Sequence, residues 1–299
     1  MRLAYGAGVR EAIDARRPVV ALESTVIAHG LPRPANLETA RALEREIRDA
    51  GAVPATICLA DGMAIVGAND ALLERLATED TVRKVSTRDL APVLATEGLG
   101  ATTVATTIEI AASAGIEVFA TGGIGGVHRG AERTLDVSAD LRALAEHPVC
   151  VVCAGAKLVL DLPKTLELLE TLGVPVLGYG TAELPAFYVR SSGIPVPHRA
   201  DDPQTAARIA RIQLDRGKGI LITVPIPDAS ALPLVDMERE IAAALEAAAR
   251  AGVNGSALTP FLLEQLADAT SGRTLTANVA LLRNNARVAA AIAAALVAL

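Results

Sequence analysis

The stretch Phe119-Ala-Thr-Gly-Gly-Ile-Gly-Gly-Val-His-Arg-Gly130 decides how this chain folds, because an apolar strand pattern runs directly into a glycine-rich turn. Residues 117–120 are typical of a short buried strand. Five glycines then fall within the nine residues 122–130, and glycine lets a backbone approach a ligand closely. We expect the turn to form a nest of backbone N–H groups for an anion, with a flexible surface loop as the alternative.

On either side of this stretch, apolar runs alternate with segments of helical spacing. Strands are predicted at residues 18–22, 54–59, 117–120, 149–153, 174–179, 186–189 and 220–224. Helices are predicted at residues 36–50, 70–77, 103–113, 139–146, 160–172, 204–215, 237–250, 260–269 and from 276 to the end. This alternation predicts an α/β fold with a largely parallel sheet covered by helices on both faces, in a single catalytic domain over residues 1–299.

Polar side chains follow the predicted strands at their carboxyl ends. Glu23, Asp61, Thr121 and Lys157 each lie at or just after such an end. Ligands of open α/β sheets usually bind beyond these ends, so we expect the four residues to meet in one cleft.

Two of these residues have side chains suited to catalysis. Lys157 follows a buried run, where a desolvated amine can act as a nucleophile, although an exposed lysine just past a strand end is the alternative. Glu23 could act as a general acid or base, or cap the next helix. Lys84 could bind phosphate or be solvated, and His29 and His128 lie near glycine turns where they could contact a ligand.

Asp136 and Asp140 are four residues apart, so on one helical turn they would share a face. Hard divalent metals prefer carboxylate oxygens together with water, which makes the pair a candidate metal site. A helix cap or a solvated charge is the alternative for either residue.

The composition excludes several classes of function. A net charge of −6 argues against a general nucleic-acid-binding surface, and aromatic residues make up only 2% of the 299 residues. Three cysteines, at 58, 150 and 153, favour a reducing compartment and small buried side chains. The N-terminus lacks a signal-peptide pattern, and the Ala-rich end from Val288 predicts a packed or oligomer-facing helix, so we expect a cytoplasmic protein.

Taken together, these segments resemble the pseudouridine-5′-phosphate glycosidase family, whose relatives include indigoidine synthase A-like proteins. The resemblance extends from about residue 20 to the C-terminus. It rests on the segments 21–25, 29–32, 54–56, 119–132, 136–140, 152–157, 259–262 and 284–286. Two segments depart from the family pattern, with Arg33 at a position that is often aromatic and a variant sequence at 224–228.

The resemblance implies the chemistry. The family reversibly cleaves the C–C glycosidic bond of pseudouridine 5′-phosphate, a step of nucleotide catabolism that gives uracil and ribose 5-phosphate and uses a divalent metal such as Mn²⁺. By this likeness Lys157 is the Schiff-base lysine that attacks ring-opened ribose, Glu23 the proton donor and Asp136 the metal ligand. The implied substrate contacts are Lys84, Val104, Thr121, His128, Ser138, Ala139, Asp140 and Asn278. A homotrimer and a separate pseudouridine kinase are further implications.

Two other functions remain open at this stage. A Schiff-base lyase or aldolase for another sugar phosphate would share Lys157 and the glycine turn. A non-catalytic sugar-phosphate sensor would need neither the acid nor the amine, so the presence of both Glu23 and Lys157 weighs against it.

Overall fold

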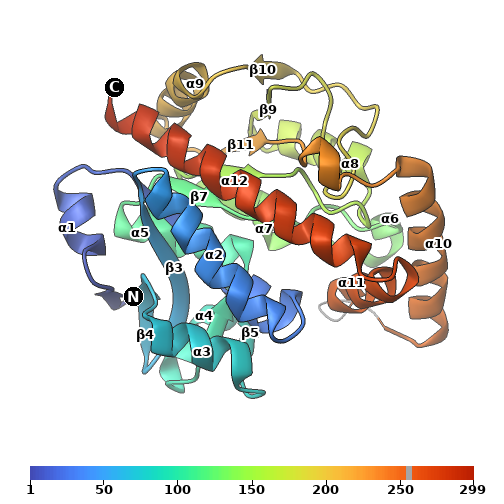
Figure 1. Cartoon of the computed structure of the whole chain (residues 1–299), viewed down its shortest axis with the longest axis horizontal. Coiled ribbons are helices and arrows are strands. Elements are labelled where there is room, and N and C mark those ends of the chain that lie inside the picture. Colours follow the sequence, from blue (N-terminus) through green and yellow to red (C-terminus); the bar gives the residue numbers. More distant parts are fainter. Residues whose placement is uncertain (254–257) are drawn as a thin grey trace.

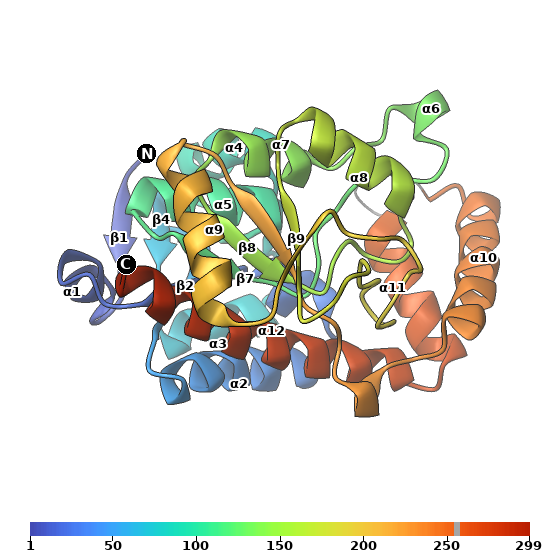
Figure 2. The same cartoon turned by 90° about the horizontal axis from the view of Figure 1, so that it is seen from above.

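The computed structural model of the chain describes residues 1–253 and 258–299, with the backbone alone at Thr259 (Figure 1). A twisted sheet lies between two layers of helices, as the view in Figure 2 shows. This arrangement confirms the predicted α/β fold with helices on both faces of a largely parallel sheet.

The strands join in one sheet in the order β1-β4-β3-β2-β7-β8-β11-β9-β10, with β6 and β5 branching from β3. Within the described residues, every strand pair is parallel except β3–β4 and β3–β6. The strands are β1 (Leu3–Tyr5), β2 (Val19–Leu22), β3 (Val53–Ala60), β4 (Met63–Val66), β5 (Arg83–Val85), β6 (Gly100–Thr102), β7 (Val118–Ala120), β8 (Cys150–Cys153), β9 (Val176–Tyr179), β10 (His198–Ala200) and β11 (Ile220–Thr223).

The α-helices connect these strands and cover the sheet. They are α1 (Val9–Asp14), α2 (Ala35–Asp49), α3 (Asp70–Thr78), α4 (Leu90–Ala95), α5 (Val104–Ala114), α6 (Ala131–Thr134), α7 (Ala139–Glu146), α8 (Leu162–Thr171), α9 (Pro203–Asp215), α10 (Leu234–Arg250), α11 (Leu258–Ala269) and α12 (Arg273–Val297). Three short helical turns of other types are η1 (Val26–Gly30, a π-helix), η2 (Thr87–Asp89) and η3 (Asp228–Ser230).

The centre of the sheet is buried on both faces. Every residue of β2, β7, β8 and β11 is buried, which explains why these strands read as continuous apolar runs rather than alternating patterns. Cys150 and Cys153 on β8 are free and buried, as is Cys58 on β3, which confirms the prediction for all three thiols. Burial raises the pKa of the Cys153 thiol to about 12.

Helices α2, α9 and α12 pack together on one face of the sheet, and α5 and α7 lie together on the other (Figure 2). Among the described residues, α12 is the one helix long and apolar enough to cross a membrane, and half of its most apolar window is buried. It packs against β2, β7 and β8 and carries the fully buried Asn285, which donates a hydrogen bond to the Thr121 carbonyl over 2.9 Å. These contacts are those of a packed core helix, one of the two roles that the sequence predicted for the Ala-rich end.

One predicted strand, at residues 186–189, is wrong. Ala186 and Val189 instead bond to each other's backbone and close a tight turn. Phe187 within it has φ +58°, a left-handed conformation that a strand does not contain. The run is apolar because the turn is buried, so its composition resembles that of a strand.

The sequence did not predict the short strands β1, β4, β5, β6 and β10, of which β1, β5 and β10 are edge strands. Two of them, β5 and β10, have two exposed residues out of three, so neither a buried run nor a clear alternation marks them.

Candidate active site

The cleft opens at the carboxyl ends of β2, β7 and β8. Leu22, Ala120 and Val152 lie side by side in these strands, so the residues that follow them emerge at the same level. The cavity there has a volume of about 440 Å³. It is lined by all the site residues that the family resemblance implied: Glu23, Lys84, Val104, Thr121, His128, Asp136, Ser138, Ala139, Asp140, Lys157 and Asn278.

Asp61 is the exception among the strand-end residues, and its predicted place in the cleft is wrong. Leu22 of β2 pairs with Thr56 of β3, but β3 continues four residues farther to Ala60. Asp61 then occupies the hairpin turn to β4 with φ +51°. The extra length of β3 therefore carries this carboxylate away from the level of the cleft.

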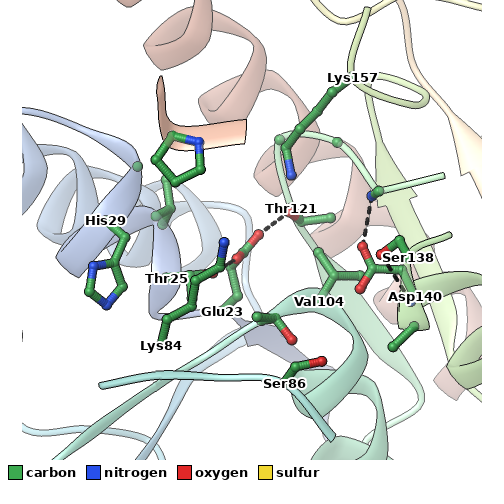
Figure 3. A pocket seen from close by; sticks show the side chains of 18 of the residues that line it. Glu23, Thr25, His29, Lys84, Ser86, Val104, Thr121, Ser138, Asp140 and Lys157 are labelled. Atoms are coloured by element: carbon green, nitrogen blue, oxygen red, sulfur yellow. Dashed lines mark hydrogen bonds between the residues drawn. The ribbon is translucent and has the colours of Figure 1, made fainter. Parts of the chain in front are cut away.

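Glu23 is held by two threonine hydroxyls at the bottom of the cleft (Figure 3). Thr25 donates to Oε2 and Thr121 donates to Oε1. Burial raises the pKa of the Glu23 carboxyl above its usual range, although Lys157 and the two hydroxyls act in the opposite direction. A carboxyl group whose pKa is raised holds a proton more readily and can deliver it to a bound substrate.

Lys157 reaches the same point from β8, which β7 separates from β2. After β8, the chain runs beside the glycine turn: Ala154 N–H donates to Gly122 O, Ile124 N–H to Gly155 O, and Lys157 N–H to Ile124 O. Gly155 has φ +83°, and a Cβ there would lie 2.1 Å from the Pro185 carbonyl oxygen, so glycine is required. Figure 3 shows the Lys157 amine pointing into the cleft toward Thr121 and Glu23.

A basic end of the cleft is built by Lys84 on β5 and His29 on η1 (Figure 3). Burial lowers the pKa of the Lys84 ammonium, and the nearby Lys157 charge lowers it further. Burial likewise lowers the pKa of His29, with Lys84 as the second cause. Ser86, Thr87 and Arg88 line the cavity next to Lys84, so cationic and hydroxyl groups gather at this end.

The glycine turn packs closely against protein, and protein acceptors occupy part of the expected anion nest. A Cβ on Gly125 would meet Ser138 Oγ at 2.4 Å, and one on Gly126 would meet Thr165 Oγ1 at 2.4 Å. Several of its N–H groups already donate to protein acceptors, namely those of Thr121, Ile124, Gly125, Val127 and His128. The nest prediction is therefore wrong for these groups, because the glycines serve close packing.

Asp140 uses its carboxylate to join three elements. Oδ1 accepts from Ala105 N–H at the start of α5 over 2.9 Å, and Oδ2 accepts from Gly125 N–H over 2.7 Å. Ser138 caps α7 and accepts from Asp140 N–H, and Ala139 is the first residue of that helix. Because α7 begins at Ala139, Asp136 lies outside it, so the prediction that Asp136 and Asp140 share a helical face is wrong.

Asp136 lies at the edge of the cleft with its side chain 33% exposed, and its Oδ2 is 3.9 Å from His128 Nδ1. The described residues contain no cluster of three or more histidine, cysteine or acidic side chains that could enclose a metal. One accessible carboxylate nevertheless fits a hard divalent cation that keeps water and takes its other oxygens from a substrate. A protein-enclosed metal cage does not fit this part of the chain.

The remaining wall is mostly apolar. Val104 begins α5, and Asn278 projects from α12 at 7% exposure beside Leu282, Pro260 and Leu263. Sequence reasoning did not assign Thr25 or the hydroxyl pair Ser86–Thr87 to the site. Thr25 closely follows Glu23 in the sequence, and Ser86 and Thr87 closely follow Lys84. This closeness to predicted site residues was the signal that could have assigned them to the site.

Known proteins resemble this chain over nearly its whole length. Residues 8–295 match the family described as indigoidine synthase A like protein. A pseudouridine-5′-phosphate glycosidase of Myxococcus xanthus is 56% identical over 298 residues, covering 99% of this chain and 98% of the relative. One of Caldanaerobacter subterraneus subsp. tengcongensis is 54% identical over 288 residues, covering 95% and 94%.

Two solved structures share the fold closely. The prealnumycin C-glycosynthase AlnA, solved in complex with ribulose 5-phosphate, superposes with a TM-score of 0.92 at 46% identity, covering 100% of this chain and 98% of that one. An indigoidine synthase A-like protein of Thermotoga maritima gives 0.90 at 35% identity, covering 99% and 97%.

Proposed function

The chain belongs to the indigoidine synthase A like family, and we propose that it is an enzyme, a pseudouridine-5′-phosphate glycosidase. It cleaves the C–C glycosidic bond of pseudouridine 5′-phosphate reversibly, giving uracil and ribose 5-phosphate. The identity to relatives of that name extends over nearly the full chain, and a structural neighbour is a C-glycosynthase in complex with a pentose phosphate. The observation that carries the proposal is the convergence of Glu23 and Lys157 in one cleft.

Lys157 is proposed as the nucleophile. Cleaving the C–C bond leaves the bonding electrons on a uracil carbon, so the reaction needs a group that stabilises the electron-deficient C1′. When the ribose ring opens, the C1′–O4′ bond breaks, O4′ takes a proton to become the C4′ hydroxyl, and the neutral Lys157 amine forms a bond to C1′. The C1′–C5 bond then breaks, its electrons stay on uracil C5, which takes a proton, and the nitrogen lone pair forms the C1′=N bond of an iminium ion. Hydrolysis of the iminium after uracil departs releases ribose 5-phosphate and restores the amine.

Glu23 is proposed as the group that moves protons. Its carboxyl delivers a proton to the departing uracil carbon and recovers one in the reverse direction. Two features support this role: the raised pKa, which keeps a proton available, and the position of Glu23 beside Lys157, whose charge influences its titration. The two threonine hydroxyls fix the orientation of the carboxyl group.

We place the substrate phosphate at the basic end of the cleft, at Lys84, Ser86 and Thr87. The occupied N–H groups of the glycine turn favour this end over the turn itself. Val104, Thr121, His128, Ser138, Ala139, Asp140 and Asn278 are proposed to border the sugar and the base, because all of them line the same cavity. Asp140 does so while holding the starts of α5 and α7 in place.

Asp136 is the residue proposed to hold Mn²⁺. When bound, such an ion supplies positive charge to substrate oxygens. The exposure of the Asp136 carboxylate at the cleft edge supports this assignment. His128, 3.9 Å away, is placed to orient that carboxylate or to contact the substrate.

The setting of the enzyme is part of the proposal. A single domain is supported by one core cluster that includes both Val9 and Leu296. A separate pseudouridine kinase is inferred because the substrate is a 5′-phosphate that another enzyme must make. The homotrimer is proposed from the resemblance of the sequence to its family, and the cytoplasmic location from its three free, buried cysteines, which favour a reducing compartment.

The test is direct. Purified protein is incubated with pseudouridine 5′-phosphate and Mn²⁺, and released uracil is measured together with ribose 5-phosphate. We expect equal amounts of the two products and none with Lys157→Ala. Absence of uracil with the wild-type protein, together with turnover of a different sugar phosphate, would replace this function by that of another Schiff-base lyase.

A further inference from the structure

The Thr25 hydroxyl lies between two acceptors that compete for its single hydrogen. Oγ1 contacts Glu23 Oε2 and lies 3.1 Å from the Thr102 carbonyl oxygen. Thr25 is 8% exposed, so bulk water has little access to this hydroxyl. One hydroxyl hydrogen cannot serve both acceptors at once, but the oxygen can also accept a hydrogen bond.

The two possible arrangements correspond to the two protonation states of Glu23. When Glu23 is ionised, the Thr25 hydrogen points to the carboxylate. When Glu23 is protonated on Oε2, its O–H donates to Thr25 Oγ1, and the Thr25 hydrogen turns to Thr102 O. Thr121 donates to Oε1 in both states, because that oxygen remains an acceptor.

We propose that Thr25 is a positioning residue for the reaction, whose hydroxyl rotation lets Glu23 gain and lose its proton without leaving a buried group unpaired. The inference rests on the proposed role of Glu23 in the cleavage reaction. A buried polar group without a partner is costly, so a fixed donor would favour one protonation state of Glu23 over the other. Thr25 acts through Glu23 and needs no contact with the substrate.

The frame around Thr25 holds the second acceptor still. Thr102 is fully buried, its N–H donates to Ser24 Oγ over 2.8 Å, and its side chain donates to Ile57 O over 2.8 Å. Thr107 donates to Thr102 Oγ1 over 2.9 Å without contacting Glu23. The network thus offers a matched control, because Thr107 is as buried as Thr102 and belongs to the same group of hydroxyls.

Charged groups around Glu23 also influence its titration and stay constant in the test. They are Lys157 after β8, Asp140 on α7 and Lys84 on β5. Thr25 pairs with Glu23 in both states, but the hydrogen bond it donates to the ionised carboxylate is stronger than the neutral one it accepts from the protonated carboxyl. Its removal should therefore raise the Glu23 pKa.

The experiment titrates Glu23 in the substrate-free protein by difference infrared spectroscopy, using the carboxyl C=O band that disappears in Glu23→Gln. Thr25→Val and Thr25→Ala should raise the Glu23 pKa by roughly one unit, the size of one lost hydrogen bond to a charged group. Thr25→Ser, which keeps the hydroxyl, should titrate like the wild type. Thr107→Val should also titrate like the wild type, even if its melting temperature falls.

A kinetic arm follows the same variants with pseudouridine 5′-phosphate. Thr25→Val should lower kcat about tenfold or more while KM changes less than about threefold, and Thr25→Ser should recover most of kcat. Unchanged titration in both hydroxyl-free variants, or an equal shift in Thr25→Ser or Thr107→Val, would overturn the inference. If the wild type releases no uracil, the proposed function fails, and the infrared titration alone decides the role of Thr25.

Discussion

Two carboxylates line the same cleft, Glu23 and Asp136, and their surroundings differ in almost every respect. Glu23 follows the central strand β2 and accepts hydrogen bonds from the hydroxyl groups of Thr25 and Thr121. Asp136 lies outside any helix or strand, is 33% exposed, and has His128 3.9 Å away. On the floor of the cleft, Glu23 and Lys157 are half-buried and Thr121 is buried, whereas most of the rim, residues 128–137, is exposed.

Under the proposed function, this difference corresponds to a division of roles between the floor and the rim. Covalent and proton-transfer steps need groups held in fixed geometry away from water, and the floor supplies these. A hydrated cation needs an accessible oxygen and room for water, and the rim supplies these. Changes on the floor should therefore stop the chemistry, and changes on the rim should alter the concentration of metal needed.

The largest effect is expected for Lys157. Lys157→Ala and Lys157→Arg should both lower kcat by at least about three orders of magnitude, because neither offers a neutral amine to C1′. Uracil release at saturating substrate is the measurement. An active Lys157→Arg enzyme would show that charge, not nucleophilicity, matters on the floor.

The next effect concerns the substrate phosphate. Unphosphorylated pseudouridine should have a kcat/KM lower by at least about a hundredfold, because two or three charge-assisted contacts of about 1.5–3 kcal/mol each are lost. Lys84→Met should remove much of the preference for the phosphorylated substrate. Equal kcat/KM for pseudouridine and pseudouridine 5′-phosphate would contradict the placement of the phosphate beside Lys84.

A smaller effect is expected at the rim. Asp136→Ala should raise the Mn²⁺ concentration needed for half-maximal activity roughly tenfold or more, with partial recovery of kcat at high metal. Isothermal titration with Mn²⁺ gives a readout that does not depend on turnover. Full activity of the wild-type protein after exhaustive chelation would show that the reaction needs no metal.

The smallest effect tests packing between floor and rim. A Cβ on Gly125 would meet Ser138 Oγ at 2.4 Å, so Gly125→Ala should lower the free energy of unfolding by about 1–3 kcal/mol. Gly98→Ala is the control, because its Cβ would meet nothing closer than 3.8 Å. Equal stability of the two variants by denaturant unfolding would show that the glycine turn can yield.

The floor was largely predictable from the sequence. Apolar runs locate β2, β7 and β8, and the residues after parallel strands necessarily emerge at one edge of the sheet. Thr121 beside Glu23 follows from the pairing of Ala120 with Leu22. The predicted place of Asp61 in the cleft was wrong because the end of an apolar run does not reveal how far a strand extends past its neighbour.

The rim and the turn depended on tertiary contacts that no local pattern encodes. Glycine spacing looks the same whether the N–H groups meet a ligand or, as here, the Asp140 carboxylate. The start of α7 at Ala139 separates Asp136 from Asp140, and a spacing of four could not show where the helix begins. The roles assigned to the site residues stay predictions until the variants are measured.

Covalent trapping is the most direct test of the iminium that we propose on Lys157. Ribose 5-phosphate is added to the protein, borohydride reduces any iminium to a stable secondary amine, and peptide mapping locates the added mass. We expect the adduct on Lys157 in the wild type, none in Lys157→Ala, and a retained adduct in Glu23→Gln, whose defect lies in proton transfer. An adduct on another lysine, or an active Lys157→Ala enzyme, would contradict this expectation.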